Sequence, residues 1–298
     1  MRVQANGIAI EVEDTGPRAD GRPAVLLVMG LGMQLIAWPA EFVRALIDAG
    51  LRVIRFDNRD IGHSQHFDHL GVPNLLWESV KQRAGLPVRP PYALHDMALD
   101  SLGVLDALGV ARAHVVGVSM GGMIAQRVAL AAPQRVLSLT SIMSSSGARY
   151  LPGPRPQVLA AFLSRPQGHD EEALVDHGVK LWKLIGSPAF PPDEVALREG
   201  VRAAVRRSFH PAGTMRQVAA VVADRRRADE LPRIKAPTLV VHGCDDPLVP
   251  LACGHDTARR IAGARFVAIP GMGHDLPPPL LQRLLDSLLP HLKKASPP

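Results

Sequence analysis

Six short runs of apolar residues constrain the fold of this 298-residue chain more than any other sequence feature. Continuous apolar runs are typical of strands that are buried on both faces of a parallel sheet. Segments with the helical spacing of apolar residues lie between them. Because strands and helices alternate, we expect an α/β fold, a mostly parallel sheet with right-handed crossovers and helices on both sides. The runs are residues 24–29, 51–56, 114–118, 136–142, 237–242 and 265–269, and the helical segments are residues 40–49, 94–108, 121–132, 252–262 and 280–292.

Two regions depart from this alternation. Residues 3–13 alternate in polarity around Asn6 and Gly7, which predicts a β-hairpin. Residues 144–232 are rich in helical patterns and prolines and contain no convincing strand. We therefore predict a core formed by residues 1–143 and 233–298, with a helical cap inserted between them at residues 144–232. The helices expected in this insertion are residues 157–163, 171–185, 194–207 and 214–223.

Composition places the chain among globular proteins. Hydrophobic residues make up 47% and charged residues 21%, which is close to the usual values and sufficient for a large core. No apolar run approaches the ~20 residues that cross a bilayer, and the first residues lack the pattern of a secretory signal. Only two cysteines occur, which fits a reducing compartment. We expect a cytoplasmic monomer or homodimer without membrane insertion.

The basic charge of the chain does not indicate nucleic-acid binding. The net charge is +6, and because six of the 34 basic residues are lysine, the other 28 are arginine. These arginines are scattered, aromatic residues make up only 4%, and no zinc-finger spacing occurs. We interpret the arginines as a solvated surface, with those of the insertion on its outer face, and expect no nucleic-acid partner.

The sequence Gly-Val-Ser-Met-Gly at residues 117–121 joins an apolar run to a helical segment. A serine in this setting occupies a tight turn, and the glycines allow neighbouring backbone to approach it closely. The helix that follows directs its N-terminal N–H groups towards the serine, where they favour an anion. This context predicts that Ser119 is a nucleophile.

A serine nucleophile needs a base, and the base needs a third group that orients it. His274 follows the last apolar run, in a loop that opens on the same sheet edge as Ser119. Asp245 and Asp246 follow the preceding run, and we choose Asp246 because Pro247 stiffens the loop directly behind it. Asp245 is the alternative and is expected to cap a turn. The chain order serine, aspartate, histidine is that of the α/β-hydrolases and differs from both large serine-protease groups.

Two backbone N–H groups are needed to stabilise an oxyanion. The amide of Met120, directly after the nucleophile, supplies one of them. The sequence Met-Gly-Leu-Gly-Met at residues 29–33 follows the first central strand, and the amide of Leu31 supplies the other.

The chain resembles α/β-hydrolases over nearly its whole length. Besides the serine motif, it carries Asp-Asn-Arg-Asp-Ile-Gly-His-Ser at residues 57–64, which is similar to the Asp-x-Arg-x-x-Gly-x-Ser loop of that family. Residues 28–30, 38–39, 55–57 and 270–274 resemble bacterial carboxylesterases of the aclacinomycin methylesterase type. The resemblance implies a Ser-His-Asp esterase with a helical cap, a small-molecule ester substrate and no cofactor. The usual His-Gly of the oxyanion loop is Met29-Gly30 here, which makes the site less polar but keeps the backbone donor.

Metal binding is a less favoured reading of two groups of residues. The loop that follows the second central strand holds three histidines and three aspartates: His63, His66, His69, Asp57, Asp60 and Asp68. A three-residue spacing suits neither face of a helix, and the family-like motif explains much of this loop without a metal. Cys244 and Cys253 are nine residues apart and are interpreted as packed thiols.

The predicted activity is hydrolysis of small-to-medium apolar esters through an acyl-enzyme. Apolar residues of the insertion, such as Phe162 and Leu181, either line an acyl pocket or form the core of the cap. Methionines near the serine, Met29, Met33 and Met120 among them, favour an adaptable apolar pocket. The same triad serves perhydrolysis, lactone opening and C–C cleavage, so these activities are alternatives. A ligand-binding fold without catalysis is a further alternative from another class.

Overall fold

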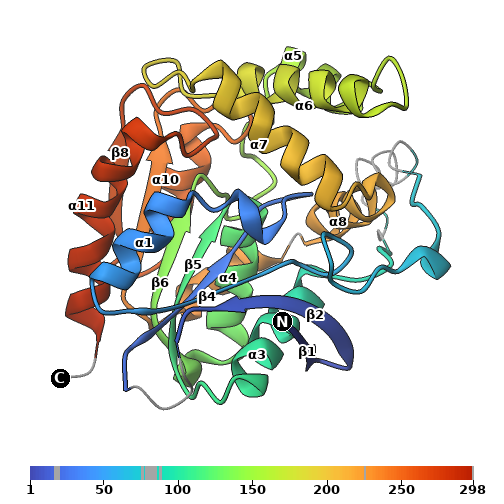
Figure 1. The fold of residues 1–298 in the computed structure, drawn as a ribbon. Coiled ribbons are helices and arrows are strands. Elements are labelled where there is room, and N and C mark those ends of the chain that lie inside the picture. The colour runs from blue at the N-terminus through green and yellow to red at the C-terminus, as the bar shows by residue number, and fades with distance from the viewer. Residues whose placement is uncertain (17–20, 75–76, 78–85, 87–88, 225, 297–298) are drawn as a thin grey trace.

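The computed structural model describes residues 1–16, 21–74, 77, 86, 89–224 and 226–296. Its centre is an eight-stranded sheet with the order β1-β2-β4-β3-β5-β6-β7-β8 (Figure 1). The pairs β1·β2 and β2·β4 are antiparallel and all the others are parallel. The strands are β1 (Arg2–Ala5), β2 (Ile8–Asp14), β3 (Ala24–Val28), β4 (Arg52–Phe56), β5 (Ala113–Val118), β6 (Val136–Ile142), β7 (Thr238–Gly243) and β8 (Arg265–Ile269).

Helices cover both faces of the sheet, which confirms the predicted fold class. Successive side chains of a strand point to opposite faces, and β3 shows this most clearly. Leu26 and Val28 join the apolar cluster that contains residues of α3 and α4, whereas Val25 and Leu27 join the cluster of α1 and α11. In Figure 1, α1 and α11 lie next to each other on the second of these faces. The helices of the core are α1 (Ala40–Asp48), α3 (Leu94–Ala107), α4 (Met120–Ala131), α10 (Leu251–Arg260) and α11 (Pro278–Ala295).

The N-terminal hairpin forms as its sequence predicts. Asn6 and Gly7 have φ values of 50° and 77°, the left-handed backbone that a tight two-residue turn requires. One expectation about the strands is wrong. Strand β8 is not buried on both faces, because it is the last strand of the sheet, and Ile269 is its only buried residue.

The register of the parallel strands brings their carboxyl ends to one edge. Val28 at the end of β3 pairs with Gly117 of β5, so the loop after β3 lies next to the turn after β5. Gly243 of β7 pairs with Ile269 of β8 in the same way. The loops that carry the predicted nucleophile, acid and base therefore start from neighbouring positions.

The insertion, defined as residues 144–232, forms helices and no strand in its described residues. It contacts the carboxyl edge at two loops, because the Gly32 amide donates to Gln217 Oε1 (2.9 Å) and the His274 amide donates to the Ile185 carbonyl (2.7 Å). Its four long helices lie at the top and right of Figure 1. They are α5 (Pro156–Leu163), α6 (Glu171–Ile185), α7 (Glu194–Arg207) and α8 (Pro211–Ala223), followed by the short α9 (Arg227–Glu230).

Two expectations about the insertion are wrong. Its arginines do not all lie on the outer face, because Arg216 and Arg227 are buried and paired with Asp60 and Asp224. Its apolar residues also do not all enter a core or a pocket. Helix α5 buries only Val158, so its remaining large apolar residues face outward. The exposed ones are Leu159, Phe162 and Leu163.

No helix in the described part of the chain is both long enough and apolar enough to cross a membrane.

Candidate active site

Ser119 occupies a strained turn between β5 and α4. Its φ of 55° is uncommon for a residue with a side chain, and its ψ is −122°. The turn is this tight because backbone crowds it on both sides. A Cβ at Gly117 would lie 2.1 Å from the Gly121 carbonyl oxygen, and a Cβ at Gly121 would lie 2.1 Å from the Val28 carbonyl oxygen. Both glycines of the motif are therefore required by close backbone contacts.

The structure brings Ser119, His274 and Asp246 into one hydrogen-bonded chain. His274 Nε2 lies 2.9 Å from Ser119 Oγ, and His274 Nδ1 lies 2.7 Å from Asp246 Oδ2. A carboxylate accepts hydrogen bonds only, so Nδ1 carries the proton and donates to Asp246. Nε2 is then free to accept the proton of the serine hydroxyl. In this arrangement a serine oxygen can lose its proton as it attacks an electrophile.

Asp246, and not Asp245, faces the histidine. Asp246 is buried, and its Oδ1 accepts hydrogen bonds from the amides of Leu248 (2.9 Å) and Val249 (2.8 Å). Its Oδ2 is thereby directed to His274. Asp245 is exposed, and its Oδ2 accepts from the Gly271 amide at 2.8 Å. The Asp245 carboxylate thus stabilises the loop that leads to His274.

His242 supports the loop that carries Asp246, a role that the sequence did not suggest. Its Nε2 donates to the Val249 carbonyl at 2.7 Å and lies 3.7 Å from Asp246 Oδ2. Because His242 is fully buried, its pKa is lowered and the neutral form is favoured. A neutral imidazole here holds the loop of residues 246–249 without adding a positive charge beside the acid.

The loop that carries His274 is held partly by the insertion. The Ser187 hydroxyl donates to Asp275, next to the base, and accepts a hydrogen bond from the Gly273 amide at 2.9 Å. The Ile185 carbonyl accepts from the amide of His274 itself. Burial raises the pKa of Asp275. Ser187 lies in no recognisable motif, and sequence reasoning missed it for that reason.

Two backbone amides in the segments next to Ser119, those of Leu31 and Met120, are the predicted donors to an oxyanion. Met120 is the first residue of α4, and Leu31 lies in the loop after β3 (the oxyanion loop, residues 29–35). This loop is close to the serine, since a Cβ at Gly30 would be 3.2 Å from Ser119 Cβ. Within the described part of the chain, neither amide has a hydrogen-bond acceptor. Unpaired N–H groups of this kind are suited to bind a negatively charged oxygen.

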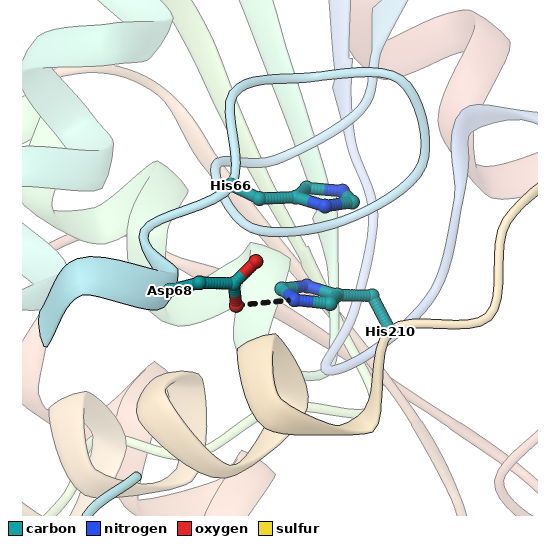
Figure 2. A group of neighbouring side chains, drawn as sticks. All are labelled: His66, Asp68 and His210. Atoms are coloured by element: carbon teal, nitrogen blue, oxygen red, sulfur yellow. Dashed lines mark hydrogen bonds and ion pairs between the residues drawn. The ribbon is translucent and has the colours of Figure 1, made fainter. Parts of the chain in front are cut away.

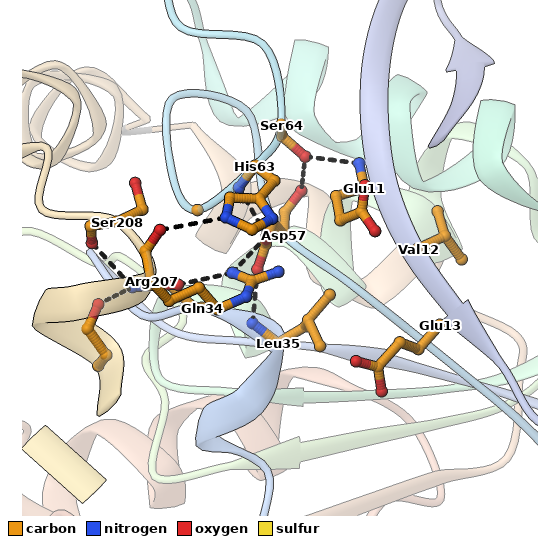
Figure 3. Close-up of polar contacts among 12 residues, drawn as sticks. Glu11, Val12, Glu13, Gln34, Leu35, Asp57, His63, Ser64, Arg207 and Ser208 are labelled. Atoms are coloured by element: carbon orange, nitrogen blue, oxygen red, sulfur yellow. Dashed lines mark hydrogen bonds and ion pairs between the residues drawn. The ribbon is translucent and has the colours of Figure 1, made fainter. Parts of the chain in front are cut away.

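The Asp-x-Arg-x-x-Gly-x-Ser motif holds the oxyanion loop in place. Asp57 is buried and accepts hydrogen bonds from the amides of Leu35 (2.7 Å) and His63 (2.9 Å). It also forms an ion pair with Arg207 of α7 at 2.8 Å. Figure 3 shows this ion pair together with Gln34, whose side-chain oxygen accepts from Arg207 at 2.6 Å. The motif thus joins the oxyanion loop to the insertion.

Asp60 of the same motif forms a buried ion pair with Arg216 of α8. Arg216 Nε and Nη2 each lie 2.8 Å from a carboxylate oxygen of Asp60, and both side chains are almost fully buried. Burial alone would raise the pKa of Asp60. Hydrogen bonds from Arg216 and from the Phe67 amide outweigh it and lower the pKa below its usual value.

Asp60→Asn is expected to lower the free energy of unfolding by about 3 kcal/mol at pH 6. Buried Arg216 then loses its two-point ion pair and keeps the exposed carboxylate of Asp68, at 3.1 Å, as its counter-charge. The loss should shrink in acid. A carboxyl whose pKa is lowered by folding stabilises the protein above its unfolded pKa of about 3.9, and this contribution disappears as the pH falls through the folded pKa. Urea unfolding of both proteins at pH 6 and pH 3 measures the difference. An equal loss at both values would assign the effect to packing.

Of the three histidines that could suggest a metal site, the structure places one in a group of possible ligands. His66, Asp68 and His210 lie together, whereas His63 and His69 are not part of the group (Figure 2). The rings of His66 and His210 are stacked, with centroids 3.8 Å apart and planes 3° from parallel, so their in-plane lone pairs do not converge on one point. His210 Nε2 bonds Asp68 Oδ1 directly at 2.8 Å, and Arg216 bonds the same oxygen at 3.1 Å. We interpret the group as a hydrogen-bonded cluster at the start of α8.

The fold and the serine turn define a class of protein, and comparison with known families agrees. The chain belongs to the α/β-hydrolase family, because the family model described as alpha/beta hydrolase fold matches residues 23–277.

The relatives add detail within that class. Rhodomycin D methylesterase of Streptomyces sp. strain C5 is 32% identical over 305 residues, which cover 95% of each chain. A putative carbamate hydrolase of Caulobacter segnis is 30% identical and covers 90% of each chain. Among solved structures, the enol-lactonase from Burkholderia xenovorans LB400 superposes with a TM-score of 0.75 at 24% identity, over 98% of this chain and all of that one. The methylesterase confirms the resemblance predicted from the sequence, and the lactonase supports the fold.

Proposed function

We propose that the protein is a serine carboxylesterase that acts through an acyl-enzyme. The observation that carries this proposal is the hydrogen-bonded chain Ser119–His274–Asp246, with separations of 2.9 and 2.7 Å. Ser119 attacks the ester carbonyl, while His274 takes the serine proton and gives it to the departing alcohol. Water then attacks the acyl-enzyme with His274 as the base again, which releases the acid and restores the serine.

The two free amides beside Ser119 have a defined part in this proposal. As the carbonyl carbon becomes tetrahedral, its oxygen becomes negatively charged and is stabilised by the N–H groups of Leu31 and Met120. Losing one such donor typically costs about 3–4 kcal/mol of transition-state stabilisation. Asp246 keeps the imidazole in the productive tautomer and stabilises its charged form.

The substrate that we propose is a small-to-medium apolar ester. The side chain of Leu31 packs against the apolar cluster that includes Met120 and Met123, so the surroundings of the nucleophile are largely non-polar. The insertion contacts the same edge of the sheet, and we propose that it is a cap over the site. A covered apolar site favours neutral acyl groups, and methionines adapt to different shapes. The named ester activity of the Streptomyces relative supports this choice.

A series of p-nitrophenyl esters tests the proposal. Each buried methylene adds up to ~0.8 kcal/mol, so kcat/KM should rise from acetate to butyrate and then fall towards palmitate once the pocket is full. The corresponding anilide should be hydrolysed far more slowly. An optimum on palmitate would indicate a lipase and contradict the proposal. If a lactone is hydrolysed faster than every ester, or if peracid forms faster than any ester is hydrolysed, an alternative activity of the same triad is favoured.

A further inference from the structure

The oxyanion loop is held at its two ends by the core. Asn58 Nδ2 donates to the Met29 carbonyl at 2.9 Å, and Asp57 accepts from the Leu35 amide at 2.7 Å. The middle of the loop, next to Leu31, has a different partner. The Gly32 amide donates to Gln217 Oε1 at 2.9 Å, and Gln217 belongs to α8 of the insertion.

Gln217 is fully buried, and both ends of its amide are used. Its Oε1 accepts from the Gly32 amide, and its Nε2 donates to the Arg59 carbonyl at 2.9 Å. Because one partner is a donor and the other an acceptor, the orientation of the side-chain amide is determined. Thr214, on the same helix, also packs closely against Gly32, because a Cβ at Gly32 would lie 3.0 Å from Thr214 Oγ1.

Helix α8 is itself fixed to the turn that follows β4. The buried pair of Arg216 with Asp60 anchors it, and His210 at its start hydrogen-bonds the Asp60 carbonyl at 2.8 Å. The backbones approach closely here, since a Cβ at Gly213 would lie 2.2 Å from that same carbonyl oxygen. Gln217 therefore extends from a helix that is held against the core next to it.

We propose that Gln217 is a positioning residue for the esterase reaction, through its hydrogen bond to the Gly32 amide. The peptide plane that contains the Gly32 N–H shares the Leu31 Cα with the plane that contains the Leu31 N–H. Fixing the first plane limits rotation at Leu31 and keeps its amide directed at the oxyanion. Gly32 has a φ of 68°, a region that glycine leaves easily. Within the turn, the Met33 amide donates to the Gly30 carbonyl at 3.2 Å, and the contact from Gln217 adds support from the insertion. The inference rests on the proposed function and assigns part of the oxyanion geometry to the insertion.

Two variants test the role of the Gly32 contact. Gln217→Leu removes both hydrogen bonds. Gln217→Glu keeps an acceptor for the Gly32 amide, and burial favours the neutral carboxylic acid, whose O–H can still donate to the Arg59 carbonyl. We expect Gln217→Leu to lower kcat about 10- to 100-fold, a part of the loss that removal of a whole oxyanion donor causes. Its KM should stay within about threefold. Affinity for a trifluoromethyl ketone, which forms a tetrahedral oxyanion on the serine, should fall by the same factor as kcat. Gln217→Glu should keep kcat within about fivefold of the wild type.

A matched control separates positioning from loss of stability. His114→Leu removes another fully buried polar side chain with two hydrogen bonds, to Ser138 and Ser296, at the opposite end of β5. It should lower the unfolding free energy but leave kcat within about twofold. An unchanged kcat in folded Gln217→Leu, or equal losses of kcat in Gln217→Leu and Gln217→Glu, would overturn the inference. The proposed function would still hold in either case, provided that turnover depends on Ser119. Turnover that survives Ser119→Ala would overturn the proposed function itself.

Discussion

Replacing Ser119 with alanine is expected to lower ester turnover by about four to six orders of magnitude, because no acyl-enzyme can form without the hydroxyl. The structure should change little. Alanine keeps the Cβ in the strained turn, and the Ser144 hydroxyl still donates to the carbonyl of residue 119 at 2.7 Å. Steady-state kinetics on p-nitrophenyl butyrate measure the loss, and thermal unfolding should give a nearly unchanged melting temperature.

A covalent probe serves as the control for that experiment. A fluorophosphonate should label the wild-type protein at Ser119 and should not label the alanine variant. Labelling of a different serine, or more than a few per cent residual turnover, would mean that the nucleophile lies elsewhere. An unlabelled wild-type protein with no turnover on any ester would favour the ligand-binding alternative.

Asp246→Asn is expected to lower kcat by about four orders of magnitude, a magnitude known for the equivalent change in a serine protease. The amides of Leu248 and Val249 both donate to Asp246 Oδ1. The asparagine oxygen must take that position, so its NH₂ group faces His274 Nδ1. The imidazole must then accept at Nδ1 and carry its proton on Nε2, where it cannot accept the serine proton.

Asp245→Asn is the matched control for that change. Asp245 is exposed and accepts one hydrogen bond, from the Gly271 amide, and an asparagine oxygen accepts that bond equally well. Turnover should therefore remain within about twofold of the wild type. A severe loss in Asp245→Asn with a mild loss in Asp246→Asn would transfer the role of the acid to Asp245.

The parts of the molecule that the sequence predicts well are those encoded locally. The Asn6-Gly7 turn, the buried parallel strands and the serine turn each depend on residues that are adjacent in the chain. The positions of His274 and Asp246 follow from one further rule, that parallel strands end at a common edge. The structure places both within hydrogen-bond distance, and their catalytic roles stay predictions.

The parts that the sequence does not reveal depend on partners far along the chain. Ser187 supports the residues beside His274 from 86 and 88 positions away, and no local pattern marks it. Arg216 is indistinguishable from a surface arginine until Asp60, 156 residues earlier, is placed against it. For α5 the local pattern is present, but it predicts the wrong environment for the apolar face of the helix. Its helical spacing is typical of a buried face, but Val158 is the one residue of α5 that is buried.

The way in which the insertion contacts the sheet has a consequence for protein engineering. Substrate range in such an enzyme would be altered most directly by exchanging residues 144–232 for those of a relative. That graft would also exchange the carbonyl of Ile185, which accepts from the His274 amide, and the side chain of Gln217, which accepts from the Gly32 amide. A chimaera that retains these two acceptors keeps the supports of both loops, whereas one that matches only the apolar lining does not. Arg207 must also be kept, because its ion pair with Asp57 supports the oxyanion loop. The transplantable unit is therefore a stretch that lies between the two acceptors and ends before Arg207, residues 188–206.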